Sequence, residues 1–226
     1  MGRSIDIVRS PLRASLGRDR TPCVPWVALA LAASIVLTGI GTNAYLHEIP
    51  ASLGHRWSTG WPALRAGRWW TLGSSFSLSR DTFMAATMPV CLGVPLSLYE
   101  RRAGHGRALL VAVVGHAVGT VVLSVVFAPL ALTGVPMLVR AAHNLDYGGS
   151  MAIAAAFGAL ASRLRDRRFR NLVIAVTLVA IPLHHQMSDW GHLTAMPLGY
   201  LADRVPSTLR RRQRSRQTVS GDAANT

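Results

Sequence analysis

Two side chains in apolar surroundings near the end of the chain have the chemistry of a hydrolase. Ser150 opens one apolar stretch directly after Gly148 and Gly149, and His192 opens another. A serine hydroxyl becomes a nucleophile when a neutral imidazole within hydrogen-bond reach takes its proton. We therefore predict a Ser150–His192 catalytic dyad that performs serine-type hydrolysis and needs neither a metal nor another cofactor.

Small residues recur at every fourth position along both stretches. They are Ala154 and Gly158 after Ser150, and Ala195 and Gly199 after Gly191. Positions four apart share one face of a helix, and small side chains allow two such faces to pack closely. This helix packing would bring Ser150 and His192 together.

The same residue types also have purely structural uses. Ser150 is a good helix N-cap, and His192 can be a hydrogen-bonded histidine of the protein interior. Asp189 stands one helical turn before His192, and Asp146 stands four residues before Ser150. Either carboxylate can orient an imidazole or cap a helix. Glycines at 148 and 149 would let a substrate backbone approach the hydroxyl.

The composition is that of a polytopic membrane protein. Apolar residues make up 50% of the 226 residues and charged residues only 15%, and the apolar residues form long uncharged blocks. We predict an all-α bundle of six transmembrane helices within a membrane domain at 23–204, flanked by an Arg-rich tail at 1–22 and a basic disordered tail at 205–226. The predicted spans are 24–46, 82–99, 107–131, 148–162, 170–185 and 189–203.

The basic residues set the predicted orientation. All 24 are arginine, and 19 of them fall on one side of the six-span arrangement. The positive-inside rule then places both termini in the cytoplasm, with the chain in the plasma membrane. Because the arginines are dispersed among loops, nucleic-acid binding is not expected. The two cysteines, Cys23 and Cys91, lack the spacing of a metal site, and no metal is expected.

Two further features concern the predicted loops and helix interiors. The loop at 47–80 carries four tryptophans, which indicates that it lies at the outer membrane surface. His116, within the third span, is expected to hydrogen-bond a neighbouring helix.

The ordered motifs of the chain resemble those of the rhomboid intramembrane serine proteases. They are Gly67-Arg68-Trp69-Trp70 in the first loop; Glu100, Gly104 and Arg107 after the second helix; Gly148-Gly149-Ser150 with Gly158; and His192 with Gly199. The resemblance covers about residues 24–203. It implies the six-helix rhomboid fold, a Ser–His dyad, and a transmembrane protein as substrate or client within the bilayer.

Three methionines depart from the rhomboid pattern. Met84 and Met88 stand where rhomboids usually have a His and an Asn near the oxyanion, and Met151 replaces the Gly after the nucleophile. A thioether cannot donate a hydrogen bond. His143 and Asn144 are candidates to replace the missing donors, and backbone N–H groups at the start of the Ser150 helix are another source.

Three functions remain open at this point. The first is an intramembrane serine protease, which we favour. The second is a catalytically silent rhomboid-like protein that binds transmembrane clients. The third is a small transporter or lipid-binding membrane protein, which short discontinuous helices would favour. The substrate and the oligomeric state do not follow from the sequence.

Overall fold

The described part of the chain is entirely helical in its regular elements. The computed structural model describes residues 24–143, 145–164, 167–168, 170–171, 174–175 and 191–204. In chain order the elements are α2 (Trp26–Gly41), α3 (Ala51–Trp57), α4 (Trp61–Arg65), α5 (Thr71–Ser77), α6 (Thr82–Ala103), α7 (His105–Val113), the π-helical turn η1 (Val114–Val118), α8 (Gly119–Ala131), α9 (Pro136–His143), α10 (Ser150–Arg163) and a last helix at residues 191–204. The all-α prediction is confirmed for these residues.

Two helices of the described residues are long and apolar enough to cross a membrane. They are Thr82–Ala103 and the continuous helix His105–Ala131, which joins α7, η1 and α8. The helices α2 and α10 are apolar but shorter, with 16 and 14 residues. The predicted fifth span lies mostly outside the described residues, as do the two predicted tails. The six-span bundle therefore stays a prediction.

The boundaries of α6 follow from its flanking residues. The Asp81 carboxylate accepts a hydrogen bond from the Met84 N–H at 2.9 Å and so caps the first turn. The helix continues past the predicted end at 99, because Gly104 is the first residue to leave helical geometry, with φ +88°. A glycine adopts this φ without steric cost, and the chain turns there directly into α7.

Glu100 connects the C-terminal part of α6 to the first turn of α2. Its fully buried carboxylate accepts hydrogen bonds from the N–H groups of Val27 at 2.9 Å and Ala28 at 2.8 Å. These belong to the first turn of α2, where N–H groups lack partners within the helix and negative charge is favoured. The Glu100–Gly104 motif thus caps one helix and turns the chain into another.

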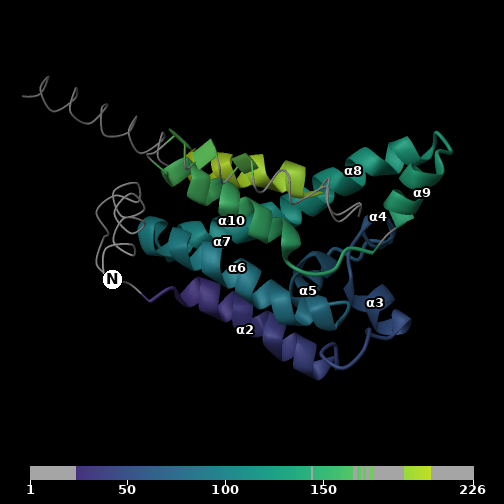
Figure 1. Cartoon of the computed structure of the whole chain (residues 1–226). Coiled ribbons are helices and arrows are strands. Elements are labelled where there is room, and N and C mark those ends of the chain that lie inside the picture. Colours follow the sequence, from purple (N-terminus) through teal and green to yellow (C-terminus); the bar gives the residue numbers. More distant parts are fainter. Residues whose placement is uncertain are drawn as a thin grey trace, which may run out of the picture.

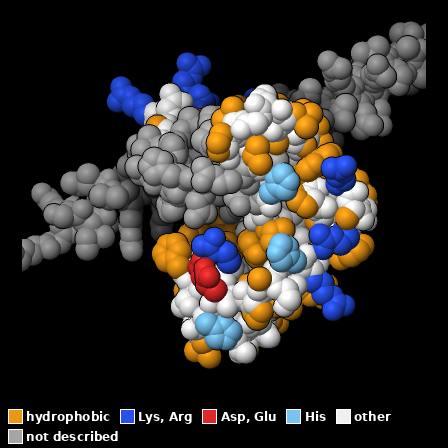
Figure 2. Space-filling view, turned by 90° about the vertical axis from the view of Figure 1, so that its right-hand side faces the viewer, with side chains coloured by type: hydrophobic (Ala, Val, Ile, Leu, Met, Phe, Trp, Pro, Cys, Tyr) orange, Lys and Arg blue, Asp and Glu red, His pale blue; other side chains and the backbone are white. Residues whose placement is uncertain are grey.

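The helices form an elongated bundle in which α2 packs on α6, and α6 packs on α10 (Figure 1). Its interior consists largely of alanine, and the larger fully buried side chains include Ile35 of α2 and Leu92, Leu96 and Tyr99 of α6. Small interior side chains let helix axes approach closely. Many large hydrophobic side chains of α2, α6 and α8 are exposed, as expected of a protein surrounded by lipid. On the face drawn in Figure 2, hydrophobic side chains form patches between polar and arginine side chains.

The loop at 47–80 folds into the three short helices α3, α4 and α5, which gather at one end of the bundle (Figure 1). Its Trp57, Trp69 and Trp70 are exposed. Tryptophans at the end of a bundle are typical of the membrane–water interface.

Candidate active site

The two glycines before α10 contact residues of α5. Gly148 has φ +80°, and its N–H donates to the Ser75 carbonyl at 2.8 Å. The Phe76 ring lies 3.2 Å from the position that a Cβ on Gly149 would occupy. These contacts fix the backbone that leads into Ser150, the first residue of α10.

The Ser150 hydroxyl does not cap its helix. The N-cap position of α10 is Gly149, and the cap has no side-chain hydrogen bond. The Ser150 side chain is half-buried. Since the capping interpretation requires a bond from the hydroxyl to the first turn, this geometry leaves the hydroxyl available for chemistry.

The helix at residues 191–204 packs against α10 with backbone touching backbone. A Cβ added to Gly158 would collide with the Met196 carbonyl oxygen, and one added to Gly199 would collide with the Ala155 carbonyl oxygen. Only glycine permits such an approach. Ala154 and Ala195 are buried in one cluster beside this contact.

Contacts along the two helices show that they run parallel. Met151 meets Gly191, Gly158 meets Met196 and Tyr200, and Ala155 meets Gly199, pairs that lie between 38 and 44 residues apart in sequence. Near the other end, the Ser162 hydroxyl donates to the Asp203 carboxylate 41 residues away. Ser150 and His192 are 42 residues apart, so they stand at the same level of the pair.

Methionine side chains fill the space around Gly148, two residues before Ser150. The Met88 and Met84 methyl groups lie 2.8 and 3.2 Å from the Cβ position of Gly148. The fully buried Met151 lies between Gly119 of α8 and Gly191. Apolar groups therefore occupy the side of the site where rhomboids usually carry oxyanion donors.

Ser75 and His116 form a second, buried Ser–His pair next to Gly148 and Gly149. The Ser75 hydroxyl and His116 Nε2 are 3.2 Å apart, and both residues are buried. The Phe76 ring meets the His116 ring edge-on, at 5.2 Å between centroids. The expected bond from His116 to a neighbouring helix is thus confirmed, with α5 as the partner. Because Ser75 and Phe76 also contact Gly148 and Gly149, His116 braces the segment that carries Ser150.

His116 also lies at an irregular point of its helix. It belongs to the π-helical turn η1, a distortion that is often found at functional sites. On the same helix, Gly115 lies against α10, where a Cβ would collide with the Ala155 side chain. The distortion and the close packing together set the position of the imidazole.

Asp146 ties the same segment to the first loop and to α8. Its backbone pairs with Thr59 at 2.8 and 3.2 Å, and the Thr120 hydroxyl donates to its carboxylate at 3.4 Å. Burial raises the pKa of Asp146 to about 7, although hydrogen bonds from Thr120 and from the Tyr147 backbone oppose the shift. Its bonds go to Thr59 and Thr120, not to the first turn of α10.

The remaining candidate residues are more dispersed. Asn144 and Asp189 lie outside the described residues. His143 ends α9, where its Nδ1–H donates to the Val139 carbonyl at 2.8 Å and its ring lines a cavity with Trp61 and Arg65. No group of His, Cys, Asp and Glu side chains with the geometry of a metal site occurs within the described ranges.

A family comparison covers most of this helical core. The sequence matches the family model described as rhomboid-like protein over residues 74–213. The chain belongs to the rhomboid-like protein family. Searches of curated proteins and of solved structures found no match. The protein is therefore a rhomboid-like membrane protein.

The sequence interpretation missed the cluster around Asp203 in this rhomboid-like protein. The nearly buried Asp203 carboxylate accepts hydrogen bonds from Tyr99 at 2.7 Å, Ser162 at 2.6 Å and Arg163 at 2.7 Å. Arg107 lies 3.6 Å away. Asp203 thus joins α6, α7, α10 and the last helix at the end remote from Ser150. The sequence feature that could have indicated this cluster is a single acid, Asp203, which stands before Arg204 in an arginine-rich part of the chain.

Proposed function

We propose that this rhomboid-like protein is an intramembrane serine protease in which Ser150 is the nucleophile and His192 the general base. The observation that supports the proposal most strongly is the parallel register of α10 and residues 191–204. Ser150 belongs to the face with Ala154 and Gly158, and His192 belongs to the face with Ala195 and Gly199. These faces meet, so both side chains belong to faces that share the same contact.

In this mechanism the oxyanion is held mainly by main-chain N–H groups, with the Asn144 side chain as a further donor. The first N–H groups of α10 have no partner within the helix, and the helix dipole is positive there. Met84 and Met88 supply no donor. Because losing one oxyanion donor typically lowers the rate by roughly a hundred- to a thousandfold, the enzyme is slow.

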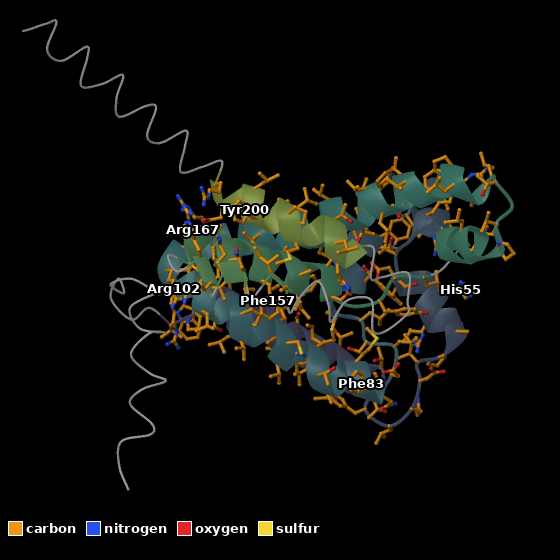
Figure 3. The ribbon with its side chains drawn as sticks, turned by 45° about the horizontal axis from the view of Figure 1, so that its top comes forward. His55, Phe83, Arg102, Phe157, Arg167 and Tyr200 are labelled. Carbon is orange, nitrogen blue, oxygen red and sulfur yellow. The ribbon has the colours of Figure 1, made fainter. Side chains whose placement is uncertain are left out.

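The proposed substrate is a transmembrane protein that is cut near the outer surface, and the protease works without a cofactor. Arg102 and Arg167 lie at the opposite end of the bundle from His55 of the first loop (Figure 3). This supports a plasma-membrane topology with cytoplasmic termini and the 47–80 loop outside. The candidate site then faces the outer half of the bilayer.

Cleavage of a co-expressed transmembrane reporter tests the proposal. Ser150→Ala and His192→Ala should each abolish cleavage at unchanged protein level, because the two members of a dyad act as a unit. Asn144→Ala should lower the rate less than either. Cleavage that persists in Ser150→Ala would remove Ser150 as the nucleophile.

One observation favours a second function, a catalytically silent protein that binds transmembrane clients. Met84 and Met88 pack on Gly148 where rhomboids usually have oxyanion donors. The small-residue faces would then serve recognition alone. In that case the wild-type protein would retain clients on co-purification and cut none of them, and Ser150→Ala would retain the same clients.

A further inference from the structure

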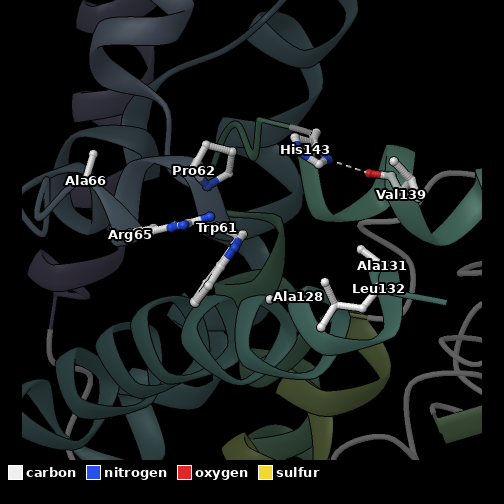
Figure 4. A pocket seen from close by; sticks show the side chains of 9 residues that line it. All are labelled: Trp61, Pro62, Arg65, Ala66, Ala128, Ala131, Leu132, Val139 and His143. Atoms are coloured by element: carbon white, nitrogen blue, oxygen red, sulfur yellow. Dashed lines mark hydrogen bonds between the residues drawn. The ribbon is translucent and has the colours of Figure 1, made fainter. Parts of the chain in front are cut away.

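A cavity of about 560 Å³ lies away from the dyad, between α4 and the C-terminal ends of α8 and α9 (Figure 4). Its wall is mostly apolar, with Trp61, Ala128 and Leu132 among the lining residues. Arg65 and His143 add two nitrogen-bearing side chains to the same lining. The site therefore combines an apolar wall with groups that attract an anion.

The guanidinium of Arg65 has no carboxylate partner in the described part of the chain. Glu48 and Asp81, the acids at the two ends of the first loop, both pair with Arg80. Arg68 donates instead to the His55 carbonyl. The charge of Arg65 is thus uncompensated by acidic side chains of the described ranges.

His143 contributes a second polar atom. Its Nδ1–H is engaged by the Val139 carbonyl at 2.8 Å, as drawn in Figure 4. The Nε2 atom lies on the other side of the ring from this bond, so it remains for a ligand of the cavity. Arg65 of α4 and His143 of α9 thus bring polar atoms to the same, mostly apolar cavity.

The cavity lies at one end of a helix that is long and apolar enough to cross a membrane. Its Ala128 and Ala131 belong to the last turn of the apolar helix His105–Ala131, so one end of a membrane span forms the wall. The exposed Trp57, Trp69 and Trp70 belong to the same loop region as α4. Tryptophan prefers the interface between headgroups and acyl chains.

We propose that this cavity binds an anionic phospholipid. The lipid phosphate contacts Arg65 and His143, and an acyl chain lies against Ala128 and Leu132. A free phosphate would leave the apolar wall uncovered, whereas an uncharged lipid would leave Arg65 without a counter-ion. The site does not depend on the dyad, so it stands whether or not Ser150 is a nucleophile.

Lipid titration of the full chain in dodecyl maltoside tests the site, with bound lipid counted by native mass spectrometry. The probes are phosphatidylglycerol, diacylglycerol with the same acyl chains, and glycerol 3-phosphate. The variant is Arg65→Gln, whose side chain is exposed in the wild type. The matched control is Arg56→Gln, since Arg56 is an exposed arginine of the same loop that stacks on Trp57 and does not line the cavity.

Phosphatidylglycerol should bind wild type and Arg56→Gln alike, and the apparent Kd should rise about fivefold in Arg65→Gln, the effect of one arginine near an anionic lipid. Diacylglycerol and glycerol 3-phosphate should bind more weakly than phosphatidylglycerol. Equal losses of phosphatidylglycerol affinity in the two arginine variants would overturn the site, because they would show that the lipid is attracted by positive charge in general. Equal binding of diacylglycerol would overturn it in favour of a groove for apolar chains, and binding of glycerol 3-phosphate at the phosphatidylglycerol affinity would overturn it in favour of a soluble anion.

Discussion

The residues around Ser150 explain both why hydrolysis is plausible and why it should be slow. The hydroxyl stands at the first position of α10 without serving as its cap, whereas the methyl groups of Met84 and Met88 lie against Gly148. In the proposed mechanism Ser150 is the nucleophile, and Met84 and Met88 supply no side-chain donor for the oxyanion. The rate then depends on backbone N–H groups at the start of α10 and on Asn144.

Restoring the missing donors should raise the rate. The double substitution Met84→His and Met88→Asn introduces two donors beside Gly148, and we expect reporter cleavage to increase by roughly a hundredfold or more. Adding Ser150→Ala to this background should abolish the gain. A double variant that folds with an unchanged Tm and cuts no faster would show that oxyanion donors do not limit the reaction.

Asp146 should make stability depend on pH. Its folded-state pKa is about 7 against an ordinary value of 3.8, so the folded protein binds this proton more tightly than the unfolded chain does. The stabilisation is therefore complete below about pH 4 and is lost as pH rises towards 7. Thermal unfolding in detergent should give a lower Tm at pH 8 than at pH 5.

The substitution Asp146→Asn should reduce this pH dependence, and Glu48→Gln, at an exposed carboxylate, should leave it unchanged. Asp146→Asn should also be more stable than wild type at pH 8, because the amide is never charged. If the variant keeps the wild-type slope, another group is responsible for it.

At the scale of elements, the candidate site depends on the close contact between α10 and residues 191–204. Gly199→Ala and Gly158→Ala each place a methyl group on a facing carbonyl oxygen, so the helices must separate. We expect each to lower the free energy of unfolding by more than the roughly 1–3 kcal/mol of an ordinary overpacked site. Both should also reduce reporter cleavage.

Gly106→Ala is the matched control, because a Cβ on this helical glycine of α7 meets no atom within 4 Å. It should be neutral or slightly stabilising, since alanine is the better helix former. Thermal and denaturant unfolding in detergent measure all three variants. If Gly199→Ala behaves like Gly106→Ala, the two small faces do not meet in solution.

Much of this arrangement follows from local patterns. The apolar blocks and the spacing of small residues predict the helices and the pairing of positions 154, 158, 195 and 199, because helical periodicity is a local property. The Glu100–Gly104 motif was recognised by resemblance, and its physical role required coordinates. Glu100 accepts hydrogen bonds from the N–H groups of Val27 and Ala28, which lie more than 70 residues away in the sequence.

Other features depended on distant contacts that no spacing reveals. Asp203 has partners on three other helices, and the pairing of Asp146 with Thr59 crosses 87 residues. The π-helical turn at His116 within the helix His105–Ala131 likewise cannot be read from its apolar composition. Such contacts arise only when the whole bundle is assembled.

At the scale of the whole molecule, the two ends of the bundle differ in chemistry. One end holds Asp203 with its basic partners, and the other holds the tryptophan-bearing loop and the start of α10 (Figure 1). With the arginine count, this asymmetry predicts cytoplasmic termini. Reporter fusions after Thr226 and near Ser58 should report inside and outside, respectively. An external C-terminus would contradict the even number of spans.

The most direct test of the account is covalent labelling of Ser150. Folded protein in detergent is treated with a fluorophosphonate, and the adduct is located by mass spectrometry of the digested chain. We predict an adduct on Ser150 in the wild type that disappears in both Ser150→Ala and His192→Ala, because the hydroxyl requires the imidazole as its base. Folded wild-type protein that takes up no label at Ser150, or His192→Ala that labels as fast as wild type, would contradict the dyad.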